Sequence, residues 1–263
     1  QNKNLLLGAW IVLLLSWETI SPFREDYGEN RIRHLGRNFL LTGLNGIVNI
    51  GIFSLVVLAT SYARDNQIGL FFSYSIPLFI QYIVLFLLYD LMLYWWHWAN
   101  HNIRFFWAFH QVHHTDQILD ISTATRFHIF EISFFVVVRI AFVFIFGASL
   151  TQMVFLETII ILFAQFSHSN IKIPDWLDHK LQSFLVTPAM HRVHHVTQQM
   201  KRDSNYCTTT SLWDHAFKTY TKPFEDETNI SIGLPEFPKL KQHYLLKLFI
   251  IPITHYPKKS KQK

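Results

Sequence analysis

The sequence predicts an all-α integral membrane protein, a helical bundle with a histidine-rich helical cap at its cytosolic end. Half of the 263 residues are hydrophobic, only 16% are charged, and phenylalanine alone contributes 25. A soluble protein of this length needs a more polar surface. The apolar residues also fall in blocks, and a block of about 20 apolar residues can cross a bilayer. We therefore expect about three spanning helices and a short helical hairpin, within a single membrane-embedded domain over residues 1–263.

The predicted bundle is made of four apolar segments. Spanning helices are expected at about 4–20, 39–60 and 70–101, and the last is long enough for its end to project from the membrane. The first lacks a clear small-residue cleavage site, so we do not interpret it as a signal peptide. The fourth segment, 130–167, is interrupted near its middle by Gly-Ala-Ser at 147–149. This break predicts two short helices that enter the membrane and return on the same side.

The remaining segments are polar or amphipathic. A histidine-rich cytosolic cap is predicted at about 102–129 and 168–224, and an amphipathic helix on the membrane surface at 244–253. The basic tail at 257–263 is expected to be solvated and disordered. The single cysteine, Cys207, excludes an intrachain disulfide and gives no sign of the redox compartment.

The distribution of the 23 basic residues predicts the orientation in the membrane. The formal charge of +5 could suggest a nucleic-acid partner, but lysine and arginine lie mainly at the edges of the apolar blocks and in the tail. This is the pattern of positive-inside topology and of contacts with anionic lipid headgroups, so we predict no nucleic-acid partner. If the loop at 21–38 is cytosolic, only Lys3 and Arg64 lie on the far side. We therefore expect every histidine at the cytosolic face.

Three histidine clusters, which we call boxes, indicate a metal centre. One has the form HxxxH and two have the form HxxHH, and together they hold His97, His101, His110, His113, His114, His191, His194 and His195. On a helix, residues i, i+3 and i+4 lie on similar faces, so the imidazoles of each box should converge. Imidazole binds first-row metals such as iron and zinc. Because a structural zinc site takes only four ligands, eight histidines predict two metal ions with four or five nitrogens each.

The boxes stand in an ordered series of motifs that resembles the fatty acid hydroxylase superfamily, also called the sterol desaturase family. The resemblance covers about residues 20–222. Its motifs are Asp90-Leu-Met-Leu-Tyr94-Trp-Trp-His97-Trp-Ala-Asn-His101, Trp107-Ala-Phe-His110-Gln-Val-His113-His114, Arg126-Phe-His128-Ile-Phe-Glu131, Phe166-Ser-His168-Ser-Asn170, Thr187-Pro-Ala-Met-His191-Arg-Val-His194-His195, Asn205-Tyr206 and Trp213-Asp214-His215-Ala-Phe217-Lys-Thr219-Tyr220. The ordered set is highly specific, whereas one box alone is a weak signal.

The resemblance implies a membrane-bound oxidoreductase with a non-haem centre of two iron ions and O₂ as co-substrate. Members of the family hydroxylate or desaturate sterols, fatty acids, sphingolipids and carotenoids, or cleave ether lipids, so a lipid substrate is implied here. The eight box histidines carry over as ligands, and His128 and His168 match two further family histidines. No catalytic residue beyond these ligands is predicted. Electrons would come from a separate redox protein, since the chain has no Gly-rich nucleotide loop.

Three positions depart from the family pattern. Ile129 stands where Arg-x-His-Pro-x-Glu has its proline, Cys207 where Asn-Tyr-Gly has its glycine, and Lys218 where Gly-Thr-Tyr has its glycine. None of these changes removes a box histidine, so the metal site is expected to survive. Local loop geometry and the choice of substrate stay open.

Polar residues near the boxes are candidates for orienting the ligands. Asp90 lies seven positions before His97 on the same helical face. It could accept a hydrogen bond from a ligand imidazole, or bond to another polar group in the bundle. Glu131 could orient His128 or pair with Arg126.

Two more polar residues complete this set. Asn170 could reach the metal site through its amide or serve as a turn residue. Asp214 could support a ligand or cap a helix. The remaining histidines are predicted not to bind metal, and these are His34, His179, His215, His243 and His255.

Two other functions stay open. Membrane acyl desaturases also carry histidine boxes, but they usually place a longer stretch between the first two boxes than the eight residues between His101 and His110. The other alternative is a non-enzymatic zinc-binding membrane protein or metal transporter. Transporters place polar ligands near the membrane midplane, whereas these boxes lie at the ends of apolar blocks. The pattern therefore favours lipid hydroxylation or desaturation.

Overall fold

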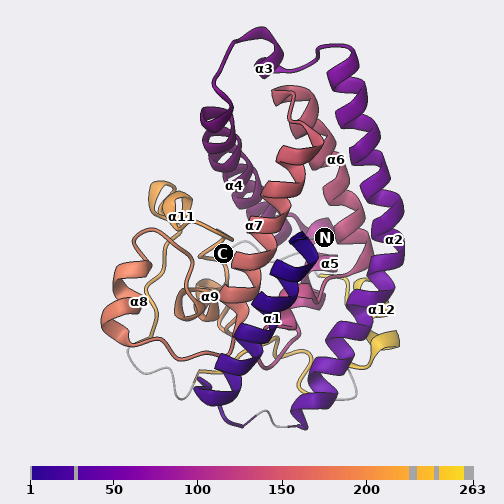
Figure 1. The fold of residues 1–263 in the computed structure, drawn as a ribbon. Coiled ribbons are helices and arrows are strands. Elements are labelled where there is room, and N and C mark those ends of the chain that lie inside the picture. The colour runs from indigo at the N-terminus through magenta and orange to yellow at the C-terminus, as the bar shows by residue number, and fades with distance from the viewer. Residues whose placement is uncertain (1, 27–28, 225–229, 240–242, 258–263) are drawn as a thin grey trace.

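The computed structural model describes residues 2–26, 29–224, 230–239 and 243–257, which contain helices but no strand. The predicted all-α fold is therefore confirmed, while the tail predicted at 257–263 lies outside the described residues apart from its first position. In chain order the helices are α1 Asn2–Ile20, α2 Arg31–Asp65, α3 Leu70–Ser73, α4 Leu78–Asn102, α5 Arg104–His114, the 3₁₀ turn η1 Thr123–Thr125, α6 Ile129–Phe146, α7 Leu150–His168, α8 Asp175–Leu181, α9 Pro188–His194, α10 Gln199–Arg202, α11 Leu212–Ala216 and α12 Leu245–Thr254. In Figure 1 the long helices α2, α4, α6 and α7 extend toward the top of the view, and α8, α9 and α11 lie together at the left, beside the lower part of α7.

Four helical segments are long and apolar enough to cross a membrane: Arg31–Ser73, which joins α2 and α3, and the helices α4, α6 and α7. This differs from the expected three spanning helices plus a short hairpin, because α6 and α7 each reach spanning length while the described apolar part of α1, Leu5–Ile20, is shorter. Large apolar side chains such as Ile47, Phe79 and Val137 are at least 66% exposed. A bilayer would cover such a surface, so the fold is that of an integral membrane protein.

A break before Pro77 divides the helix predicted at 70–101 into α3 and α4. Proline has no backbone N–H and disfavours a helical conformation in the residue before it. Tyr74 is extended, with φ −130° and ψ 132°, and Pro77 stands at the N-terminal cap of α4. Helix α4 therefore begins at Leu78, and its C-terminal end carries the first histidine box.

The turn between α6 and α7 requires glycine. Gly147 follows α6 in the left-handed conformation, with φ 73°, which glycine adopts without strain. A Cβ on Gly69 would lie 2.1 Å from the backbone nitrogen of Gly147, so these two chain segments approach too closely for a side chain. Ser149 and Gln152 then form a capping box at the start of α7. The structure thus breaks the apolar segment at 130–167 where the sequence predicted a break.

A shared apolar core holds the four long helices together. Its buried members include Val56 of α2, Leu85 of α4, Val143 of α6 and Leu156 of α7. This packing fixes the C-terminal ends of α4 and α7, which carry the first box and His168. The core therefore determines where these histidines enter the cap.

One face of α12 packs against α5. Leu248 and Ile251 are buried in a cluster with Val112 of α5, while Leu246 and Ile253 are 79% and 81% exposed. The exposed apolar face fits the predicted contact with a membrane surface. That the cap faces the cytosol stays a prediction from the distribution of lysine and arginine.

A buried ionic network joins α2 to the cap. His34 of α2 lies between two aspartates, with Nε2 2.8 Å from Asp116 Oδ1 and Nδ1 2.9 Å from Asp120 Oδ2. The fully buried Arg126 donates to Asn38 Oδ1 at 2.7 Å. Burial alone would raise the pKa of Asp116, but His34 and Arg126 hold it well below its usual range. Because Asp116 closely follows α5, the network fixes the helix that carries the second box.

Candidate metal centre

Nine histidines meet in two groups that could each hold a metal ion. The five-histidine group is His97, His101, His110, His114 and His194, and the four-histidine group is His113, His168, His191 and His195. Within each group, one ring nitrogen of every histidine lies within 4.8 Å of the corresponding nitrogens of the others. The structure thus brings all eight box histidines together and adds His168 as the ninth.

Each HxxHH box divides its histidines between the two groups. In the box of α5, the first and third histidines belong to the five-histidine group and the second, His113, to the four-histidine group. In the box of α9 the assignment is reversed, and its second histidine, His194, belongs to the five-histidine group. On a helix, residue i+4 lies about 40° to one side of residue i, and i+3 lies about 60° to the other side. A box therefore presents two rings to one group and one ring to the other, instead of three to a single point.

The five-histidine group has its lone pairs turned inward. The Nε2 atom of all five rings is buried without a hydrogen-bond partner among the described residues. Four of the five rings donate from Nδ1 instead: His97 to Tyr206 O at 2.7 Å, His110 to Glu131 Oε1 at 2.7 Å, His194 to Ser204 O at 2.7 Å and His101 to Asp203 Oδ1 at 3.3 Å. With the hydrogen on Nδ1, the lone pair is left on Nε2. Buried acceptors without a partner are costly, and a metal ion would satisfy them together.

In the four-histidine group, the Nε2 atoms crowd together. His168 Nε2 lies 3.0 Å from His113 Nε2 and 2.9 Å from His191 Nε2. His195 Nε2 lies 3.1 Å from His191 Nε2. Nitrogens bound to one tetrahedral ion at 2.0–2.1 Å stand about 3.3 Å apart, so the spacing is close to that of a ligand set. The Nδ1 atom of His168 donates to Ala164 O at 2.7 Å, which leaves the lone pair on Nε2.

The two groups adjoin. The ring centroids of His114 and His195, which belong to different groups, lie 4.3 Å apart. Those of His110 and His113, again from different groups, lie 5.3 Å apart. Ions held by the two groups would therefore be neighbours in one centre.

Burial keeps His113, His114, His191 and His194 neutral. It lowers the pKa of His113, His114 and His191 well below the usual range, and the neighbouring imidazoles lower it further. Burial also lowers the pKa of His194 to about 3, although its bond to Ser204 acts in the opposite direction. Neutral imidazole is the form that binds a metal ion. The donor set thus fits two ions held by imidazole nitrogen.

Comparison with known proteins identifies the family to which this histidine-rich centre belongs. Residues 82–219 match the family model described as fatty acid hydroxylase, and this range contains all nine histidines. The chain belongs to the fatty acid hydroxylase family. The resemblance predicted from the motifs is thereby confirmed.

Among relatives of this family member are alkylglycerol monooxygenases. The human protein is 30% identical over 143 residues, which cover 50% of this chain and 28% of that protein. The protein of Danio rerio is 27% identical over 143 residues, with the same coverage of both chains. The chain thus spans 28% of the length of these relatives. An ornithine lipid hydroxylase of Rhizobium tropici is 23% identical over 229 residues, which cover 84% of this chain and 67% of that protein. No solved structure matches the chain significantly.

His128 lies outside both groups, although the family motif predicted it as a tenth ligand. Its Nδ1 accepts from the backbone N–H of Phe130 at 3.2 Å, so the ring caps the N-terminus of α6. Its Nε2 lies 3.2 Å from Phe249 O. These two bonds orient the His128 ring away from the metal groups. The structure therefore brings together nine of the ten predicted ligands.

The bonds described for Asp90 and Asn170 hold loops in place. Asp90 Oδ2 accepts from Thr210 Oγ1 at 2.5 Å and from Trp213 Nε1 at 3.1 Å, so it ties α4 to the segment around α11. Asn170 Oδ1 accepts from the backbone N–H of Arg24 at 2.9 Å, and its amide donates to Arg24 O at 2.8 Å. For Asp90 these bonds match the second interpretation, a bond to another polar group. Asn170 instead bonds to a segment distant in the sequence, which neither of its interpretations described.

Asp214 supports a ligand through a loop. Its two carboxylate oxygens accept from the backbone N–H groups of Tyr206 and Cys207 at 2.8 and 2.9 Å. The carbonyl of Tyr206 in turn accepts from His97. Asp214 thus fixes the loop that orients His97, which is an indirect form of the predicted support.

Glu131 orients a histidine of the second box. Its Oε1 accepts from His110 Nδ1 at 2.7 Å and from Asn100 Nδ2 at 3.3 Å. The predicted partners were His128 and Arg126, which are close in sequence. The structure instead places the start of α6 against α5, so the carboxylate reaches across to the second box.

Replacing Glu131 by glutamine is expected to weaken metal binding by the five-histidine group by about 10–100-fold. The amide cannot provide the charge-assisted bond that fixes the His110 ring. Metal retention against a chelator measures the effect. Glu25→Gln, which changes an exposed carboxylate, is the matched control. Equal retention in both variants would contradict the role assigned to Glu131.

An apolar cavity of about 240 Å³ adjoins both histidine groups. Its walls come from α4, α5, α6 and α7 and include His97, His110 and His168. Apolar side chains such as Phe135 and Ile160 line other parts of it. A mostly apolar cavity beside a candidate metal centre fits a hydrocarbon chain.

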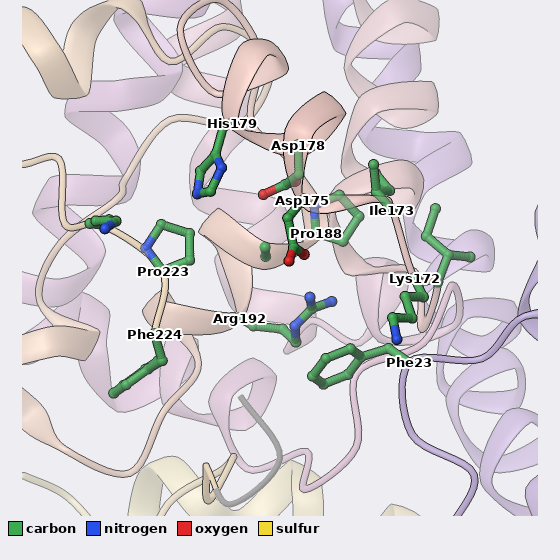
Figure 2. A pocket seen from close by; sticks show the side chains of 13 residues that line it. Phe23, Lys172, Ile173, Asp175, Asp178, His179, Pro188, Arg192, Pro223 and Phe224 are labelled. Carbon is green, nitrogen blue, oxygen red and sulfur yellow. The ribbon is translucent and has the colours of Figure 1, made fainter. Parts of the chain in front are cut away.

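A second cavity, of about 530 Å³, lies beside α8 and α9. Figure 2 shows its lining side chains, with Arg192 near Phe23 and Asp178 on the facing segment. The Arg192 guanidinium lies 3.7 Å from the centre of the Phe23 ring. None of the nine histidines lines this cavity. The apolar cavity is therefore the candidate substrate site.

Proposed function

We propose that the chain is a membrane-bound oxidoreductase that hydroxylates a lipid with O₂ at a centre of two iron ions. The observation that carries this proposal is the pair of adjoining histidine groups, one with five inward Nε2 atoms and one with four crowded Nε2 atoms. Imidazole nitrogen suits iron as well as other first-row metals, and the family membership favours iron. The one cysteine, Cys207, lies outside both groups, so no thiolate would contribute.

Bound iron would supply the activation of O₂ that an unactivated C–H bond requires. The side chains around it supply placement. Hydrogen bonds from His97 to Tyr206 O and from His110 to Glu131 keep both rings in one tautomer and orientation. Phe135 and Ile160 would hold the hydrocarbon chain beside the histidines and exclude water from it.

The proposed substrate is a lipid with a long hydrocarbon chain. Two kinds of relative support this, because their names are alkylglycerol monooxygenase and ornithine lipid hydroxylase. Both names denote insertion of oxygen, so we infer hydroxylation in preference to desaturation. The cavity lies between spanning helices, which would let a lipid enter from the bilayer. Electrons would come from a separate redox protein at the face predicted to be cytosolic.

The test compares the lipids of a host with and without the gene, in the presence of O₂. We expect a hydroxylated lipid that appears only with the intact chain and is absent with His191→Ala, which removes one ligand of the four-histidine group. The purified protein is expected to contain iron. Stoichiometric zinc in protein made with ample iron, together with no oxidised lipid, would overturn the proposal in favour of a zinc-binding protein or transporter.

A further inference from the structure

The apolar cavity contains an ion pair in the membrane-spanning part of the bundle. Arg139 lies near the middle of α6, Glu157 near the middle of α7, and both line the cavity. The guanidinium binds the carboxylate through two bonds, from Nε to Oε1 at 2.7 Å and from Nη2 to Oε2 at 3.0 Å. The hydroxyl of Tyr89, from α4, donates to the same carboxylate. Three spanning helices therefore meet at one polar point in the cavity.

Helix packing alone does not account for this ion pair. Charged side chains in membrane-spanning segments are costly and commonly mark substrate pathways. A buried ion pair gives little stability beyond that of apolar residues of similar volume. The side chains of Arg139 and Glu157 remain 19% and 20% exposed, respectively. Both side chains line the cavity, so a molecule that occupies it can reach them.

We propose that Arg139, Glu157 and Tyr89 form a subsite that binds an uncharged hydroxyl group of the lipid substrate. The proposal rests on the proposed function, since it concerns the same cavity. The charges of the ion pair cancel, so a neutral ligand matches them. A hydroxyl can accept from the guanidinium and donate to the carboxylate at the same time. A charged headgroup gains little here, because the attraction of one member of the pair is offset by the repulsion of the other.

The position of the subsite separates the hydroxyl from the site of oxidation. Arg139 lies eight positions after Glu131 in α6, and Glu131 contacts His110. This separation is about 12 Å along a helix. A lipid bound at the subsite would thus present a carbon remote from its hydroxyl to the histidines, with an alkyl segment filling the space between. The subsite would determine both the class of lipid and the position of oxidation.

The experiment measures binding to the purified protein in detergent micelles without reductant, so that no lipid is oxidised. The probes are hexadecanol and heptadecane, which differ by a hydroxyl in place of a methyl group. Dissociation constants come from the dependence of the unfolding temperature on ligand concentration. We expect at least about tenfold tighter binding of hexadecanol, because heptadecane leaves the polar groups unmatched. The double variant Arg139→Met/Glu157→Met should bind both probes equally, while Ile160→Leu, a volume-conserving change in the cavity wall, should keep the preference.

The single variant Glu157→Gln provides a second test if the double variant does not fold. It removes the negative charge and leaves that of Arg139, so the preference between hexadecanol and palmitate should shift toward palmitate by at least about tenfold. Equal binding of hexadecanol and heptadecane by the wild type would overturn the proposal. A preference that survives in the double variant would overturn it as well, and so would an unchanged preference in Glu157→Gln. None of these readouts needs turnover. If the protein prefers hexadecanol but oxidises no lipid, the proposed function is wrong and the hydroxyl-binding subsite is still supported.

Discussion

Replacing His113 or His194 by alanine is expected to abolish lipid oxidation and to lower the metal content, with the membrane fold largely retained. The two substitutions act on different groups, since His113 belongs to the four-histidine group and His194 to the five-histidine group. Loss of a residue that only orients a ligand costs about 10–100-fold in metal affinity or activity, so loss of a ligand should cost at least about a hundredfold. The measurements are the amount of oxidised lipid and the metal content of the purified variants.

The matched control for these variants is His179→Ala. His179 is exposed and belongs to neither group, so its replacement should change neither readout. Retained metal and full activity in either His113→Ala or His194→Ala would contradict the proposed centre. A variant that loses both metal and helical content would point to a folding role instead, and circular dichroism separates these outcomes.

Replacing His34 by alanine is expected to destabilise the protein by roughly 3–5 kcal/mol, the cost of removing one partner from a buried ionic contact. The change would leave the carboxylates of Asp116 and Asp120 buried without the ring that bridges them. It should also weaken metal binding, because Asp116 closely follows the second box. Urea unfolding in detergent micelles measures the free energy of unfolding.

The control for this prediction is His255→Ala. His255 is exposed, and surface substitutions usually change the free energy of unfolding by less than about 0.5 kcal/mol. If His34→Ala unfolds at the same urea concentration as His255→Ala, the network does not hold α2 to the cap. A loss of stability without any loss of metal affinity would mean that the network stabilises the fold but does not position the metal ligands.

Much of the centre could be predicted because its chemistry repeats in the sequence. The boxes place imidazoles at helical spacing, and the apolar blocks place them at the ends of long helices. How the boxes divide between the two histidine groups could not be predicted, since it depends on how α5 and α9 face one another. His113 and His194 hold equivalent positions in their boxes, yet they belong to different groups.

Residues that act across the fold were predicted least well. The carboxylate of Glu131 bonds to His110, in another helix, whereas its predicted partners were the sequence neighbours His128 and Arg126. His128 itself follows a family motif, but a local bond to the backbone of the next helix turns its ring away. The contacts of His34 join segments more than eighty residues apart, and no local pattern reveals such a pair.

The bounds of the spanning helices were also predicted only in part. The apolar run at 70–101 predicted one helix, although it contains Pro77, where the structure interrupts it. The run at 130–167 predicted a short hairpin, but each of its two helices is long enough to span. Hydropathy locates the apolar segments, while local backbone constraints decide where each helix begins and ends.

The most direct test of the two-ion centre is the number of iron ions per chain in protein that oxidises lipid. The geometry of the nine imidazoles predicts two, with nitrogen as the protein ligand to both and no sulfur. Activity with a single iron ion per chain, or with a thiolate bound to iron, would contradict it.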